Sequence, residues 1–251
     1  MKRHLLLCAT NYIGQSSALK GCLNDMKNVR AWLQKFYGSW DSEVALLGSD
    51  MSKANWLEAL REFVARLGSD GQGFHAHSHH GSYDRDPKES DGRRELWVPD
   101  DYGKADMISD DDVSAIYNGV QTGARLTDWA DCCHAAGSTR DLSFKDEGSR
   151  FLPITNEVLT NLTSTPVDVE RRPGIAQLAA CRSSQTSADA YINGEYCGAF
   201  TCYALAAQAD CPLTLGDIVD DSSRLLARNG YEQRPEFCGC DALALKTIWT
   251  R

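Results

Sequence analysis

The stretch GFHAHSHHG, residues 73–81, decides the fold, because it is typical of a buried strand whose carboxyl end carries polar side chains. An amphipathic helix is predicted before it, with Ser52 as its N-cap and Gly68 at its end. Strands and helices alternate along the chain, which predicts an α/β fold with a mostly parallel sheet and functional groups at the strand ends. Strands are predicted at residues 5–9, 43–49, 73–81, 124–137, 174–181 and 242–249, and helices at 22–38, 52–68, 111–120, 198–209 and 214–230.

Composition limits the classes of protein that the chain can belong to. With 251 residues, of which 42% are hydrophobic, it can bury a large core without covalent crosslinks. Its ten cysteines are scattered and no export signal precedes them, so we expect reduced thiols and a cytoplasmic location. No apolar run approaches the roughly 18 residues of a membrane span. The net charge of −9 argues against a nucleic-acid partner and leaves room for a basic ligand.

Four of the six histidines lie in residues 73–81. His75, His77 and His80 follow the spacing of zinc ligands in metallo-β-lactamase-type hydrolases, so a zinc-dependent hydrolase is one hypothesis. Against it, only His134 remains downstream as a further ligand, and His79 stands where an aspartate is expected. Packing of His75 and His77 on one face of the strand is the plainer alternative.

A second hypothesis uses only His80, the last histidine before Gly81. The strand predicted at residues 124–137 carries Cys132 and Cys133 near its end. A thiolate beside an imidazole is a strong nucleophile, so two neighbouring strand ends could form a catalytic pair. Simple burial of the two thiols is the alternative, since free cysteines are commonly interior.

Seven short motifs follow one another along the chain: GCLND (21–25), HSHHG (77–81), PDDYGKADMISDD (99–111), DCCHAA (131–136), STRDLSF (138–144), CRSSQTSADA (181–190) and YEQRPEF (231–237). They resemble, in the same order, motifs of the metacaspases, caspase-like cysteine peptidases. The resemblance runs from the first strand to about residue 237 and begins without the Pro-rich extension of many relatives, so we expect a form without a prodomain.

The resemblance implies a caspase-like three-layer α/β/α sandwich with a mostly parallel central sheet. It implies a single peptidase domain over residues 1–251, with a large segment at about 1–145 and a small segment at about 173–251. An exposed connector is expected between them at about 138–172. Metacaspases are mostly monomers, so a monomer is expected that acts on proteins or peptides.

The resemblance also assigns roles to residues. Cys133 is the expected nucleophile and His80 the general acid and base, and the backbone N–H groups of Gly81 and Cys133 are the expected oxyanion donors. The family cleaves after Arg or Lys, and paired carboxylates suit a guanidinium. The residues expected to bind that side chain are Cys22, Asp25, Ser78 and Asp131.

Calcium is the expected activator, since the family commonly requires it and Ca²⁺ prefers oxygen ligands. The matching positions are Asp101, Asp110, Asp111 and Asp141. Solvated acidic loops are the alternative, and Ser183–Ser184 stand where the family carries two aspartates.

Basic residues in the connector suggest that the enzyme cleaves itself there; they are Arg140, Lys145, Arg150, Arg171 and Arg172. Two departures from the family pattern support a rival, a catalytically impaired caspase-like scaffold that binds partners. His79 replaces a glycine before the catalytic histidine, and Ala135–Ala136 replace Ser-Gly after the nucleophile.

Overall fold

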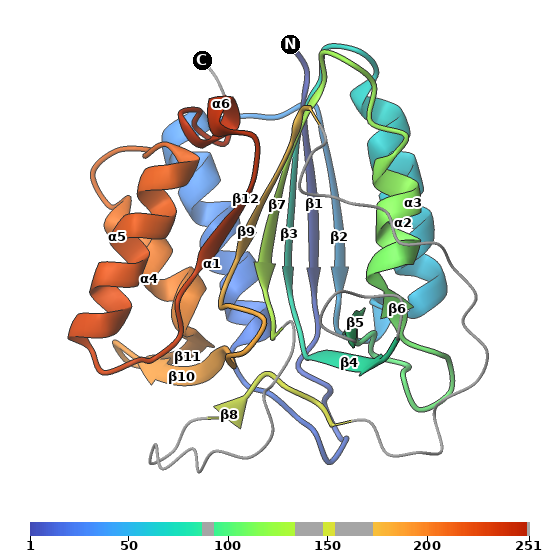
Figure 1. Cartoon of the computed structure of the whole chain (residues 1–251), viewed down its shortest axis with the longest axis vertical. Helices are drawn as coiled ribbons and strands as arrows, with labels where there is room; N and C mark the ends of the chain where they lie inside the picture. Colours follow the sequence, from blue (N-terminus) through green and yellow to red (C-terminus); the bar gives the residue numbers. More distant parts are fainter. Residues whose placement is uncertain (87–92, 134–147, 154–172, 250–251) are drawn as a thin grey trace.

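A six-stranded sheet forms the centre of the computed structural model, which describes residues 1–86, 93–133, 148–153 and 173–249 (Figure 1). The strand order is β12-β9-β7-β3-β1-β2. Within this sheet β1, β2, β3, β7 and β9 are parallel to one another, while β12 is antiparallel to β9. The strands are β1 (Arg3–Ala9), β2 (Ser42–Leu47), β3 (Gln72–Ser78), β7 (Arg125–Asp131), β9 (Ile175–Ala179) and β12 (Glu236–Gly239).

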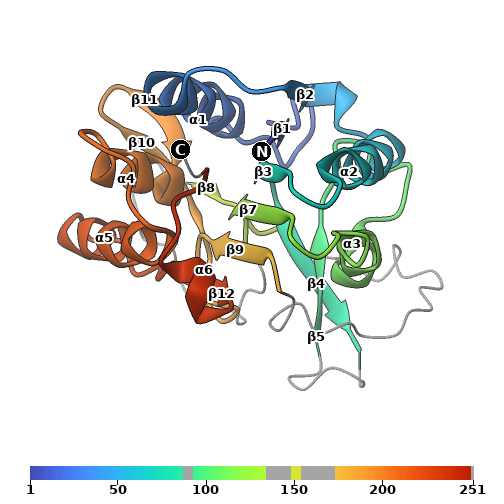
Figure 2. The ribbon, with the colours of Figure 1, turned by 90° about the horizontal axis from the view of Figure 1, so that it is seen from above.

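Helices cover both faces of this sheet (Figures 1 and 2). On one face lie α1 (Cys22–Tyr37), α4 (Ala199–Ala207) and α5 (Leu215–Arg228), and on the other α2 (Lys53–Leu67) and α3 (Asp110–Tyr117). Each face has its own apolar cluster, one including Phe74 and Trp129 and the other including Trp56 and Leu126. The layers therefore form the α/β/α sandwich that the sequence predicts.

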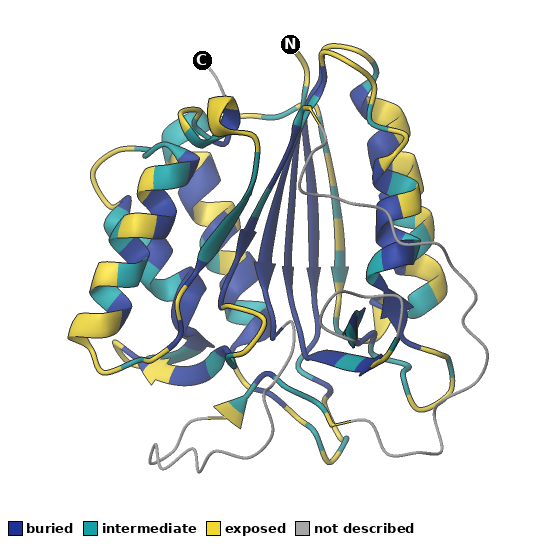
Figure 3. Cartoon of the chain, viewed as in Figure 1, coloured by how far each residue is buried: buried dark blue, intermediate teal, exposed yellow. Residues whose placement is uncertain are grey.

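The central strands are buried on both faces, as parallel strands between helices usually are (Figure 3). In β3 all seven residues are buried, including His75 and His77. Ser52 caps α2 by accepting a hydrogen bond from the Asn55 backbone N–H, which confirms the predicted start of that helix. None of the described helices is long and apolar enough to cross a membrane.

Three segments differ from the sequence-based prediction. The prediction of a strand at residues 242–249 is wrong. Residues 242–244 belong to a short helix, α6 (Asp241–Ala244), and the apolar side chains of Ile248 and Trp249 pack in the core without belonging to a strand. The final strand is instead β12. Residues 82–112, where no strand is predicted, include most of β4 (Gly81–Arg85) and all of β5 (Arg93–Trp97) and β6 (Ile108–Ser109), which form a small antiparallel sheet.

A second small sheet joins two strands of the small segment to one strand from the connector. It consists of β8 (Gly148–Ser149), β10 (Ala188–Ile192) and β11 (Glu195–Gly198). A two-residue turn joins β10 to β11, with Asn193 at φ 53° and Gly194 at φ 94°. Asn-Gly is the strongest short hairpin signal in a sequence, so this hairpin was predictable.

Candidate active site

Strand register brings the predicted pair of catalytic residues together. Ser78 at the end of β3 is directly opposite Asp131 at the end of β7. His80 and Cys133 each follow two residues later, so both lie just beyond the carboxyl ends of neighbouring strands, at the same edge of the sheet. The two backbones touch at Gly81, because a Cβ built there would lie 1.4 Å from the carbonyl oxygen of Cys133. Only glycine permits that approach.

Cys133 is a buried, free thiol held by the backbone of one residue. Its Sγ accepts a hydrogen bond from the Ser187 N–H at 3.0 Å and lies 3.8 Å from the Ser187 carbonyl oxygen. Cys132, the next residue toward the N-terminus, is also buried and belongs to the opposite face of the sheet, as the alternation along a strand requires.

The His80 ring is held in one tautomer. Its Nε2 lies 2.7 Å from the Ser17 carbonyl oxygen, which can only accept, so Nε2 carries the proton. Nδ1 is therefore the basic nitrogen, and it is buried with no hydrogen bond of normal geometry among the described residues. Burial lowers the pKa of His80, more than the Ser17 carbonyl raises it, so a neutral imidazole is favoured.

Three of the predicted substrate-binding residues line one buried pocket. Ser78 Oγ donates to Asp25 Oδ2 at 2.7 Å, and Asp131 lies beside them at the end of β7. Cys22, the fourth, is buried at the start of α1, where burial raises the pKa of its thiol. The pocket is occupied by a side chain of the chain itself, Arg150.

Arg150 forms ion pairs with three buried carboxylates. Its guanidinium lies 2.8 Å from Asp25 Oδ2, 3.1 Å from Asp131 Oδ1 and 2.9 Å from Asp189 Oδ1. It also donates to Ser78 Oγ at 2.7 Å. Burial by itself would lower the pKa of Arg150, but Cys22 and the carboxylates raise it well above its ordinary value. The prediction that the connector is exposed is therefore wrong at Arg150, because these carboxylates draw its side chain inside.

The backbone around Arg150 is extended along the site. Ser149 pairs with Ala188 in the antiparallel β8–β10 ladder, and the Arg150 N–H donates to the Ser187 carbonyl at 3.0 Å. The Arg150 carbonyl accepts from the Gly81 N–H at 2.8 Å, and the Leu152 N–H donates to the Gly81 carbonyl at 3.0 Å. The Gly81 N–H, the predicted oxyanion donor, is thus bonded to the carbonyl of the residue that fills the pocket.

Asp189 is a pocket residue that sequence reasoning missed. It belongs to β10, and its carboxylate also accepts from the N–H groups of Lys20 (2.8 Å) and Gly21 (3.0 Å). The signal was present: Asp189 is the aspartate of the CRSSQTSADA motif, which the sequence analysis used only as a marker of resemblance.

The expected calcium ligands do not meet in one site in the described part of the chain. Asp101 accepts from the Lys53 N–H at 2.9 Å and Asp110 from the Asp111 N–H at 2.8 Å, while Asp141 lies outside the described residues. Beside α3, Arg94 is bonded to Asp84, and this bond, with Asp86 and Asp111, raises the pKa of the guanidinium. These residues as placed do not provide the six to eight oxygens that Ca²⁺ needs.

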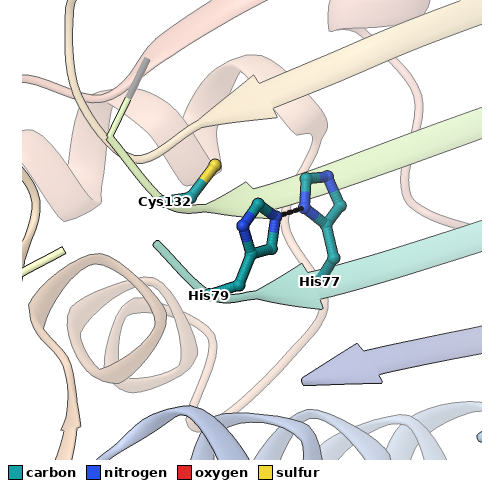
Figure 4. A group of neighbouring side chains, drawn as sticks. All are labelled: His77, His79 and Cys132. Carbon is teal, nitrogen blue, oxygen red and sulfur yellow. Dashed lines mark hydrogen bonds between the residues drawn. The ribbon is translucent and has the colours of Figure 1, made fainter. Parts of the chain in front are cut away.

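The predicted zinc ligands are also divided. Among the described residues, the groups whose ligand atoms lie within 4.8 Å of one another are His75, His77 and Asp128, and His77, His79 and Cys132 (Figure 4). His80 belongs to neither group. Its ring packs on Tyr12, with 4.9 Å between ring centroids, and Tyr12 is part of the apolar cluster on the other face of the sheet. The set His75, His77 and His80 is therefore not assembled.

The fold and this edge of the sheet define a caspase-like protein. A solved structure of a protein from Geobacter sulfurreducens has the same fold, with a TM-score of 0.73, 19% identity and coverage of 98% of this chain and 97% of that one. The family described as Metacaspase, peptidase C14 domain, matches residues 2–143. The chain belongs to this family of cysteine peptidases.

Fungal members of the family are similar to most of the chain. Metacaspase-1 of Meyerozyma guilliermondii is 26% identical over 288 residues, and Metacaspase-1A of Aspergillus fumigatus is 29% identical over 281 residues. Each match covers 94% of this chain and 68% of the relative. Metacaspase-1 of Kluyveromyces lactis is 28% identical, with 94% of this chain and 65% of the relative covered. The chain therefore spans about two thirds of the length of these relatives.

Proposed function

We propose that this chain is a cysteine endopeptidase that cleaves after Arg or Lys, with Cys133 as the nucleophile and His80 as the general acid and base. The single observation that carries this proposal is the position of Arg150. A guanidinium among three carboxylates, with its carbonyl on the Gly81 N–H, has the placement expected of the residue before a cleaved bond.

The reaction follows from the positions of these groups. His80 Nδ1 takes the thiol proton as Cys133 Sγ attacks the carbonyl carbon, and the Gly81 N–H stabilises the oxyanion. The imidazolium then gives its proton to the leaving amine, which breaks the peptide bond and leaves a thioester on Cys133. Water, deprotonated by His80, hydrolyses the thioester and restores the thiol.

The first substrate is the chain itself, cut between Arg150 and Phe151. Residues 148–152 follow the extended path of a bound peptide, paired to β10 before the bond and to Gly81 after it. Cleavage would free the new carboxyl terminus at Arg150 to leave the pocket. A second substrate with Arg or Lys could then enter.

Mass spectrometry of the purified chain tests self-cleavage. We expect a new N-terminus at Phe151, no cut in Cys133→Ala, a retained cut in Arg150→Lys and a lost cut in Arg150→Gln. Arg182→Gln is the matched control, since that side chain is 60% exposed and should leave the cut unchanged. A cut only at other positions would contradict the assignment of Arg150.

Peptide reporters test the specificity. An arginine-P1 reporter should be hydrolysed by the processed chain, and an aspartate-P1 reporter should not. Activity should be lost in Cys133→Ala and in His80→Ala. Preference for the aspartate-P1 reporter would overturn the proposed pocket.

Calcium activation stays a prediction from the resemblance, because the described aspartates do not form a site by themselves. The reporter assay with and without Ca²⁺ tests it directly. If calcium acts at the start of α3, Asp111→Asn should remove the response, while Asp241→Asn, on an exposed residue at the start of α6, should retain it. A response unchanged in Asp111→Asn would exclude that place.

Two observations favour the alternative function, a catalytically impaired scaffold. No hydrogen bond joins Cys133 Sγ to the His80 ring in the described residues, and Arg150 blocks the pocket. An intact chain that hydrolyses neither reporter, with or without calcium, would support this alternative.

A further inference from the structure

Three histidine rings lie side by side on the α2–α3 face of the sheet, behind the proposed dyad. The rings of His75 and His77 are stacked with centroids 4.7 Å apart, and those of His77 and His79 with centroids 5.0 Å apart. All three side chains are fully buried, and Trp56 and Trp97 pack against them. The proposed peptidase reaction uses none of these imidazoles.

With every ring neutral, these histidines cannot supply a hydrogen-bond donor to each of their close polar contacts. His79 Nδ1 lies 2.6 Å from the His80 carbonyl oxygen, so it carries the proton and His79 Nε2 presents a lone pair. That lone pair faces His77 Nδ1 at 2.8 Å (Figure 4). If His77 is neutral and its Nδ1 carries the proton for that lone pair, His77 Nε2 is left as a lone pair 3.3 Å from the Asp128 carboxylate. If Nε2 carries the proton, two lone pairs face each other across 2.8 Å.

A second proton on His77 would satisfy both contacts, since both nitrogens of an imidazolium donate; a bound cation between His77 Nδ1 and His79 Nε2 also removes the conflict. It would leave the His77 Nε2 proton to face Asp128 Oδ1, where Nε2 is now buried without a hydrogen bond of normal geometry. A carboxylate behind a ligating histidine is the usual support in metal sites. His79 has the equivalent support from the His80 carbonyl.

Cys132 supplies a third ligand to the same point. Its Sγ, His77 Nδ1 or Nε2 and a ring nitrogen of His79 lie within 4.8 Å of one another (Figure 4). Two imidazoles and one thiolate suit Zn²⁺, which binds nitrogen at about 2.0–2.1 Å and sulfur at about 2.3 Å, better than they suit Ca²⁺ or Mg²⁺. We propose that His77, His79 and Cys132 bind a zinc ion, with Asp128 supporting His77.

The zinc site would help to position the two catalytic residues from the opposite face of the sheet. His79 directly precedes His80 and Cys132 directly precedes Cys133, so one ion bound to both would tie the ends of β3 and β7 together. Binding releases the Cys132 thiol proton to solvent. The metal would lie on the opposite face of the sheet from the pocket of Arg150, so its role is positional rather than hydrolytic.

Metal titration of the full chain in the Cys133→Ala background tests the proposal, because that variant removes the other candidate thiolate. Zinc added to chelator-treated protein should bind at one ion per chain, measured by competition with a chromophoric chelator. Cobalt in its place should give a thiolate-to-metal band in the near ultraviolet. Cys132→Ser should abolish the band, and Asp128→Asn should weaken zinc binding by about 10–100-fold.

Matched controls keep the result interpretable. Cys8→Ser alters another buried thiol facing the same layer and should retain the cobalt band, as should His4→Gln on a buried histidine that lies in neither candidate metal group. Circular dichroism checks that each variant is folded. Absence of a band in folded Cys133→Ala protein, or a band that survives Cys132→Ser, would overturn the site. Neither outcome depends on peptidase activity, so the two proposals fail separately.

Discussion

The two faces of the sheet carry buried charge in different ways at the ends of β3 and β7. On the α1–α4 face, three carboxylates share one cation, Arg150, which comes from a segment far along the chain. On the α2–α3 face, Asp128 accepts from His75 Nδ1 at 2.8 Å, on the directly opposite residue of the neighbouring strand. A cation on a separate segment can leave and be replaced by another, whereas a hydrogen-bond donor built into the sheet cannot. The difference indicates which face exchanges ligands.

The largest expected effect is the difference in peptidase activity between removing a thiol on one face of the sheet and removing a thiol on the other. Cys133→Ala should lower hydrolysis of an arginine-P1 reporter by about a thousandfold or more, because it removes the attacking sulfur. Cys8→Ala, a buried thiol of β1 that packs on the α2–α3 side, should keep the rate within about threefold and lower stability by about 1 kcal/mol. Equal losses in the two variants would mean that packing, not chemistry, sets the rate.

Stability measurements compare the two buried charge clusters. Arg150→Gln leaves three carboxylates without their cation and should lower the free energy of unfolding by about 3–5 kcal/mol. Asp128→Asn removes a carboxylate whose hydrogen-bond donor His75 is a neutral imidazole, since burial lowers the pKa of His75 to about 4, and the substitution should cost about 1–2 kcal/mol. Urea unfolding of uncut protein, in the Cys133→Ala background, gives both values. A larger loss in Asp128→Asn would reverse the comparison.

Backbone contact between the two strand ends gives a smaller, local effect. In Gly81→Ala, the new methyl group would overlap the Cys133 carbonyl oxygen, so the donor and the nucleophile must separate. We expect kcat to fall by about a hundredfold. Gly103→Ala is the control, since a Cβ there meets nothing within 4 Å. A normal kcat in folded Gly81→Ala would argue against Gly81 as an oxyanion donor.

The parts of the site that follow from strand periodicity were predictable, and the parts that depend on distant contacts were not. Alternation along β3 and β7 places Ser78 beside Asp131 and separates His79 from His80, and the sequence shows that pattern directly. The place of Arg150 depends on three carboxylates from α1, β7 and β10, which meet only after folding. The apolar run at 242–249 was ambiguous in another way, because short runs suit a strand or a packed loop equally.

The smallest expected effect is a dependence of KM on pH, which should arise from Asp25 on one face of the sheet and not from Asp128 on the other. Burial raises the pKa of Asp25 to about 7, whereas His77 and His75 outweigh burial and hold the pKa of Asp128 below its ordinary value. Arg150 opposes the rise at Asp25, so once Arg150 has left the pocket Asp25 is protonated still more readily as the pH falls, while Asp128 stays ionised. Only ionised Asp25 pairs with a guanidinium, so KM for an arginine-P1 reporter should rise about tenfold from pH 8 to pH 6. Asp25→Asn should raise KM at pH 8 and flatten its pH profile; a profile unchanged by that substitution would place the titrating group elsewhere.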